Sequence, residues 1–288
     1  MNFKTLLFTF AGLLIAGSLM AQPIVIDGGL ENIGLLEITI NGDTATDGTR
    51  NDPNQVYELK SGNFYIQQTA INVNNPGGTI IIRGQEGGTK PVWVKQEKEE
   101  VDVGTNQIKG SLTMQNIHYQ TMQLVDRALP WSAFNLNADS AHLLVEDMLV
   151  EFCNGIIWNL NSVTTGAEIE IRNSYFRDLN PFTQWWASRV VQNKVPTDKF
   201  IFENNTVSGG GLTMLAQESL TEYAVINHNT FINNHKYPAL NQYWKELYFT
   251  NNLFVNANMV GEDMENVATG GQDPDGLMHG ITGVEKQG

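Results

Sequence analysis

The sequence predicts an all-β fold, a single right-handed parallel β-helix (β-solenoid) that is formed by one chain and carries an Asn ladder. Short apolar–polar segments recur along the chain with an Asn or Asp at a fixed place. Val, Ile, Phe and Tyr fill these strand-length segments, and Gly, Asn and Pro separate them, which favours strands over helices. An apolar stretch at the amino end predicts that a leader segment precedes this fold.

The first 21 residues have the layout of a secretory signal peptide. Lys4 precedes an apolar run from Leu6 to Leu19, and the small residue Ala21 stands before Gln22. The run is short and interrupted by Gly, which predicts cleavage near Gln22 rather than a membrane span, with a signal anchor as the alternative. We therefore expect a secreted or cell-surface protein with no transmembrane span in the mature chain.

Six segments share one pattern, in which an apolar residue stands two places before a polar position and another stands three places after it. The polar positions are Asn116, Asp147, Asn173, Asn204, His228 and Asn251, and Gly84 is an earlier member. Successive spacings from Asn116 are 31, 26, 31, 24 and 23 residues. A period of this size is typical of a solenoid, whose turns bury their apolar residues against one another.

The polar position predicts a structural ladder. At a bend between two sheets, an inward amide can satisfy unpaired backbone groups and stack on the amide of the next coil. Asp147 and His228 are then substituted ladder members rather than catalytic groups. We expect residues from about 80 to 255 to form parallel strands, with a rise of about 4.8 Å for each coil.

The repeats divide the chain into four parts. Residues 1–21 are the signal peptide, and residues 22–60 are an N-terminal cap and the first turn, because the exposed edge of a β-helix needs covering. Residues 61–260 are the coils. Residues 261–288 are an acidic turn and tail, either naturally short or truncated.

The net charge argues against one class of partner, and the cysteine content limits the covalent chemistry of the chain. The formal net charge is −14, which disfavours nucleic acid because the field of the protein repels phosphate. Cys153 is the only cysteine, so no internal disulfide can form. It lies in the apolar stretch that begins at Val150, which predicts a buried, unreactive thiol rather than a nucleophile.

The opening of the repeat region carries a family resemblance. Ile40-Asn-Gly-Asp-Thr is followed by Asp47-Gly-Thr-Arg50, then by Pro53-Asn54 and Val56-Tyr-Glu-Leu-Lys60. With the recurring Asn, this stretch resembles the first turn of secreted β-helix proteins of the pectate-lyase-like superfamily, in the version common in exported proteins of Bacteroidota. The resemblance covers roughly Leu36 to Leu277 and implies a fold and a compartment rather than one activity.

The nearest enzymes in this resemblance are of the chondroitinase-B and alginate-lyase type, which use a Lys base and an Arg on neighbouring coils. This chain has Gly211-Leu-Thr-Met-Leu-Ala-Gln217 where that family carries its Arg and His, so the pair is not matched. Lys194 and Arg189 are the remaining catalytic candidates. Glu146, Glu170 and Glu203 stand near the ladder, as paired carboxylates for glycoside hydrolysis would, but exposed solvated charges are the favoured interpretation.

One insertion breaks the acidic trend. Residues 172–199 carry a net charge of +3, and Trp185 and Trp186 lie inside the longest insertion between ladder positions. Loops on a rigid solenoid commonly carry binding groups, so the loop from Asn180 to Lys199 is the predicted wall of a glycan groove. The predicted ligand-binding residues are Trp185, Trp186, Arg189, Lys194, Tyr243 and Trp244. An internal aromatic stack is the alternative for the tryptophans and is favoured for Trp158.

No cofactor is predicted, although Asp273 and Asp275 in an acidic turn could offer oxygens to Ca²⁺. An ordinary Asp-Pro-Asp-Gly turn is the alternative there. Two functions follow: a carbohydrate-binding or structural, adhesive surface protein without catalysis, or an extracellular polysaccharide lyase or glycoside hydrolase acting on an acidic polysaccharide. The sequence favours the first, with a polysaccharide or cell-surface glycan as partner.

Overall fold

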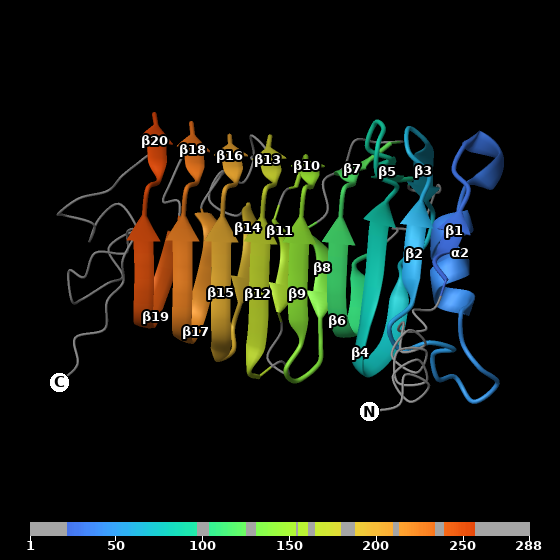
Figure 1. Ribbon diagram of the computed structural model, residues 1–288, viewed down its shortest axis with the longest axis horizontal. Helices are drawn as coiled ribbons and strands as arrows, with labels where there is room; N and C mark the ends of the chain where they lie inside the picture. The colour runs from blue at the N-terminus through green and yellow to red at the C-terminus, as the bar shows by residue number, and fades with distance from the viewer. Residues whose placement is uncertain are drawn as a thin grey trace, which may run out of the picture.

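The computed structural model describes residues 22–96, 104–124, 131–153, 155–160, 165–179, 188–209, 213–233 and 239–256. These residues form a parallel β-solenoid, drawn as a row of stacked strands in Figure 1. The parallel β-solenoid predicted from the repeats is confirmed. Its right-handed sense stays a prediction, and the predicted signal peptide and acidic tail lie outside the described residues.

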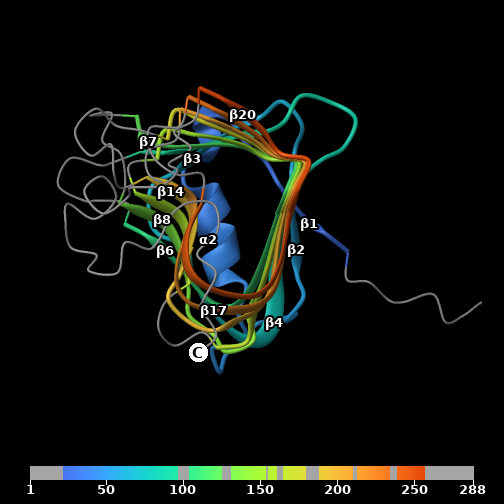
Figure 2. The same ribbon diagram turned by 90° about the vertical axis from the view of Figure 1, so that its left-hand side faces the viewer.

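The strands belong to two sheets. The first has 12 strands: β1 (Ile24–Ile26), β2 (Val56–Leu59), β4 (Asn72–Gly84), β6 (Asn106–Gln115), β8 (Ser132–Leu136), β9 (His142–Glu146), β11 (Ile156–Leu160), β12 (Ala167–Arg172), β14 (Arg189–Asn193), β15 (Thr197–Glu203), β17 (Thr213–Asn227) and β19 (Ala239–Thr250). The second has 8 strands: β3 (Phe64–Gln67), β5 (Val92–Lys95), β7 (His118–Gln123), β10 (Leu149–Glu151), β13 (Tyr175–Arg177), β16 (Thr206–Ser208), β18 (Thr230–Ile232) and β20 (Leu253–Val255). All pairings between these strands are parallel, so each coil repeats the path of the coil before it, as Figure 2 shows down the axis.

The apolar positions of the repeat form the interior. The residues two places before the polar position stack from Ile82 in β4 to Phe249 in β19. Those three places after it stack from Tyr119 in β7 to Phe254 in β20, and Trp93 in β5 extends this second stack by one coil. The rings of Phe202 from the first sheet and of Phe231 and Phe254 from the second stack on one another in the interior, with centroids 6.5 and 5.1 Å apart. Trp158 is fully buried with its ring edge on Phe176, so the internal position favoured for it is confirmed.

The predicted polar position occupies the bend between the two sheets, but it faces outwards. Its residues adopt left-handed backbone conformations, with φ between 50° and 54° at Asn116, Asp147, Asn173, Asn204, His228 and Asn251. Asn and Asp tolerate this conformation better than most residues, which explains their recurrence. Asn204 is exposed, so the prediction that its amide points inwards is wrong.

The inward ladder lies one residue later, at Ser174, Asn205, Asn229 and Asn252. The Asn205 backbone N–H donates to Asn229 Oδ1 at 2.9 Å, and the Asn229 N–H donates to Asn252 Oδ1 at 3.0 Å. Asn205 Nδ2 also donates to the Ile171 carbonyl at 2.9 Å. Asn205, Asn229 and Asn252 each use the amide oxygen and the amide nitrogen to pair backbone groups of the preceding coil, and the Ser174 hydroxyl oxygen accepts from the Met148 N–H of the coil before it.

The amino end folds over the stack. A 3-10 helix, η1 (Leu30–Asn32), leads into α2 (Leu35–Gly42), whose Leu36 and Ile40 are buried against the first coils. Arg50, from the opening motif of the resemblance, donates to the Ile40 carbonyl at 2.6 Å and contacts Asp43 and Tyr57. This buried arginine ties the helix to β2, which gives the opening motif a structural role.

Replacing Asn205 by Ala should lower the free energy of unfolding by about 1–3 kcal/mol, because the Ser174 N–H and the Ile171 carbonyl lose their buried partner. Chemical denaturation of the purified protein measures this. The matched control is Asn204→Gly, since Gly accepts a left-handed backbone and the side chain removed there is exposed. Equal losses in the two variants would contradict the ladder assignment.

Candidate functional site

The outer face of the first sheet carries a polar residue in every coil at one position. This row follows the register of β2, β4, β6, β9, β12, β15, β17 and β19, and consists of Glu58, Arg83, Gln115, Glu146, Arg172, Glu203, Asn227 and Thr250. Each member stands immediately before the bend. Neighbouring coils lie about 4.8 Å apart, so the row presents one polar group at each such step.

Contacts between neighbours hold this outer row in place. Arg83 donates to Glu58 Oε2 from Nε at 3.1 Å and from Nη2 at 2.8 Å. Gln115 donates to Glu146 at 3.0 Å, and Asn227 donates to Glu203 at 3.4 Å. The side chains are therefore ordered by their own neighbours and do not depend on a ligand for their positions.

A polar groove lies over the first coils of this row. The loop between β4 and β5, teal in Figure 2, stands away from the coil and supplies one side of it. The lining residues are Glu58, Arg83, Gly84, Gln85, Glu86, Gly87, Gly88, Lys90, Gln115, Asn116, Glu146, Asp147 and Asn173. They come from successive coils, so the groove crosses the strands and follows the solenoid axis.

Lys90 closes one side of the groove by reaching across two coils. Its Nζ donates to Asn116 Oδ1 at 3.0 Å and to the Asp147 carbonyl at 2.7 Å, and it forms an ion pair with the Asp147 carboxylate at 2.6 Å. Gly84, the earlier member of the repeat, allows this close approach of coils, because a Cβ there would lie 2.1 Å from the Asn116 carbonyl oxygen. The groove floor is thus formed by tightly stacked backbone.

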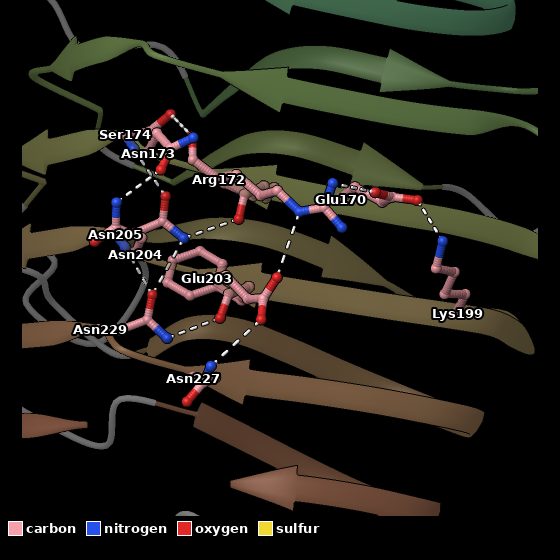
Figure 3. Close-up of polar contacts among 12 residues, drawn as sticks. Glu170, Arg172, Asn173, Ser174, Lys199, Glu203, Asn204, Asn205, Asn227 and Asn229 are labelled. Atoms are coloured by element: carbon pink, nitrogen blue, oxygen red, sulfur yellow. Dashed lines mark hydrogen bonds and ion pairs between the residues drawn. The ribbon is translucent and has the colours of Figure 1, made fainter. Parts of the chain in front are cut away.

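A charge cluster lies further along the same face (Figure 3). Glu170 lies between Leu144 and Ile201 in the register, and only 10% of its side chain is exposed. Lys199 donates to Glu170 Oε1 at 2.5 Å, and Arg172 pairs with Glu170 Oε2 at 2.9 Å. Burial alone would raise the pKa of Glu170, but the hydrogen bond from Lys199 and the nearby cationic groups outweigh it and lower the pKa.

Two exposed tyrosines adjoin this cluster. Tyr223 in β17 and Tyr248 in β19 have ring centroids 5.8 Å apart and are 37% and 49% exposed. Tyr223 stands beside Lys199 in the register, which places an aromatic pair next to the charges. Exposed aromatic rings beside hydrogen-bonding groups are the usual components of sites that bind amphipathic rings.

A second carboxylate is held on the other sheet. Glu151 is 1% exposed, and it contacts His118, Gln120 and Arg177 from the coils on either side. Burial would raise the pKa of Glu151, but the hydrogen bonds from His118 and Arg177 outweigh it and lower the pKa. Its oxygens are taken up by these contacts, which makes it a structural group between β7, β10 and β13.

The predicted binding residues are not brought together on the described surface. Arg189 is 9% exposed at the start of β14, and Trp244 is 5% exposed with its ring 6.1 Å from Phe200. Trp244 is therefore part of the core, and the prediction that it faces a ligand is wrong. Lys194 is exposed just after β14.

Several predicted residues lie where the structure gives no side-chain description. Trp185 and Trp186 and the metal candidates Asp273 and Asp275 are outside the described residues, and so is the side chain of Tyr243. Their predicted roles stay predictions.

The remaining sequence candidates have structural surroundings. Cys153 is buried, as predicted, and burial raises the pKa of its thiol to about 11, which favours an unreactive thiol. Glu146 and Glu203 are partly exposed, whereas Glu170 is largely buried among cations, so the expectation of a solvated charge is wrong for Glu170. The signal missed was the residue immediately before each repeat position. This residue is polar in every coil from Arg83, before Gly84, to Thr250, before Asn251.

No family model matches this chain, and no curated protein matches it. No helix among the described residues is both long enough and apolar enough to cross a membrane.

Replacing Glu151 by Gln should lower the free energy of unfolding at pH 7 by about 1–3 kcal/mol, because Arg177 and His118 lose their anionic partner. The folded pKa of Glu151 lies below its usual value of 4.5. Its contribution is therefore complete above about pH 4.5 and is lost as the pH falls through the folded pKa.

Denaturation midpoints measured from pH 7 down to pH 3 test this. The difference between wild type and Glu151→Gln should shrink towards the acid end. A difference that stays constant or grows on acidification would contradict the assignment of Glu151 as a paired anion.

Proposed function

We propose that this protein is an exported, non-catalytic β-solenoid that binds an extended polysaccharide along the outer face of its first sheet. The observation that carries the proposal is the groove from Glu58 to Asn173, which is lined by polar residues of successive coils. A ligand that crosses several coils must itself be extended. A polysaccharide meets this requirement and offers hydroxyl groups at regular steps.

The chemistry of the groove favours a glycan over other linear polymers. Its lining contains the amides of Gln85, Gln115 and Asn116 and the cations Arg83 and Lys90 beside carboxylates. Such groups can both donate to and accept from sugar hydroxyls. The net charge of −14 opposes nucleic acid, and the polar lining offers no apolar anchor for a hydrophobic peptide.

Binding is favoured over catalysis by the state of the carboxylates. Glu58 is occupied by Arg83, and Glu146 accepts from Gln115. A general acid for glycoside hydrolysis needs a raised pKa, whereas the pKa of Glu170 is lowered. The alternative of a lyase or hydrolase acting on an acidic polysaccharide is retained as an outcome of the test.

A glycan array followed by calorimetric titration of the best ligand tests the proposal. Wild-type protein should bind an extended glycan, and Gln115→Ala should weaken that binding about fivefold, because one hydrogen-bonding group in the groove is lost. Lys60→Ala is the matched control, since Lys60 pairs with Asp27 outside the groove lining.

Failure of every glycan to bind, or equal weakening by both variants, would contradict the proposal. Each array ligand is also incubated with the protein and assayed for new reducing ends and for unsaturated uronate. Turnover in either assay would replace binding by the enzymatic alternative.

A further inference from the structure

Three possible metal ligands meet on the outer face of β9 and β12. His142 lies beside Glu168 in the register, and Glu170 follows on the same face. The imidazole nitrogen and one carboxylate oxygen of each glutamate lie within 4.8 Å of one another. These residues lie on two neighbouring coils of one sheet, so the paired strands fix the positions of their backbones.

The side chain of His142 is 42% exposed, but its Nε2 atom makes no hydrogen bond with the described residues at this place. Its Nε2 atom is buried and has no hydrogen-bond partner among the described residues, and it lies 3.7 Å from Glu170 Oε1. A buried nitrogen that is left unpaired costs free energy unless something binds it. The imidazole is therefore aimed at the carboxylates without a direct hydrogen bond to them.

A cation already sits between the two carboxylates. Lys199 Nζ lies 2.5 Å from Glu170 Oε1 and 3.9 Å from Glu168 Oε2. Its side chain is 37% exposed, so its long stem can move the ammonium group into solvent. Figure 3 shows Lys199 reaching Glu170 from the neighbouring strand.

We propose that His142, Glu168 and Glu170 bind a divalent transition-metal ion such as Zn²⁺, which displaces the Lys199 ammonium group. One imidazole and two carboxylates suit Zn²⁺ better than Ca²⁺ or Mg²⁺, which prefer oxygen ligands alone. Tetrahedral Zn²⁺ places its ligands about 3.4 Å apart. Rotation of Glu168, whose side chain is 48% exposed, closes the site to that size.

The bound ion would join two coils. His142 belongs to β9 and both glutamates belong to β12, so the metal adds a side-chain link between two coils that are already paired through their backbones. An ion that binds only the folded chain raises the unfolding temperature as its concentration rises. The proposal does not depend on glycan binding.

Calorimetric titration of the metal-free protein with Zn²⁺ tests the site, with Co²⁺ absorption as a measure of coordination. One ion per chain should bind and raise the unfolding temperature. His142→Ala and Glu168→Gln should each weaken binding at least about tenfold, since even residues that only support metal ligands contribute that much. Lys199→Gln should strengthen binding about fivefold, the effect of removing one competing ion pair.

Glu31→Gln is the matched control, because it removes one exposed carboxylate elsewhere in an acidic chain. It should leave Zn²⁺ binding unchanged. Absence of saturable binding by the wild type would overturn the proposal. So would binding that is indifferent to His142→Ala and Glu168→Gln, or a Lys199→Gln variant that binds more weakly.

Discussion

The structure depends on the parallel register that places each residue directly above its counterpart in the previous coil. At a spacing of about 4.8 Å, a side chain meets the equivalent side chain of its neighbours on both sides. Inside, this allows the stack of Phe231 on Phe254 and the ladder of Asn205 and Asn229. Identical apolar rings and amides attract one another when stacked, so repetition of sequence becomes a source of stability.

The same register restricts the outer face, because like charges stacked at this spacing would repel. In the outer row, each charged side chain therefore has neighbours of opposite charge or neutral polar neighbours. Arg83 follows Glu58, and Arg172 stands between Glu146 and Glu203. A strongly acidic protein thereby presents a face on which anions and cations are interleaved. Such a face offers fixed hydrogen-bonding groups at regular steps, which is the basis of the proposed polysaccharide binding.

Much of the fold could be predicted from the sequence, because the spacing of apolar residues around one polar position is long-range information repeated six times. The sequence pattern did not show which of two adjacent positions in each coil points inwards to form the ladder. Asn204 and Asn205 are adjacent and chemically identical, and the left-handed residue at the bend interrupts the alternation of inward and outward side chains. One signal was present: the inward position holds Ile117 and Met148 in earlier coils, and both are buried.

The candidate site was harder to predict than the fold. The outer row could be recognised only after the coils were aligned, and the groove also needs the loop that ends at Lys90, which no repeat specifies. Trp244 shows the converse difficulty. Trp244 is aromatic and follows Tyr243, which predicted a binding residue. In the structure it is buried instead, because its ring packs on Phe200. Long-range contacts of this kind are not encoded in a local pattern.

Amide hydrogen exchange measured by NMR tests the inward ladder most directly. The backbone N–H groups of Ser174, Asn205 and Asn229 each donate to a side-chain oxygen of the next coil rather than to a strand. The account predicts that these three protons exchange as slowly as those of the central strands, because they open only when the stack opens. Rapid exchange at these three positions, with protected strands on either side, would contradict it.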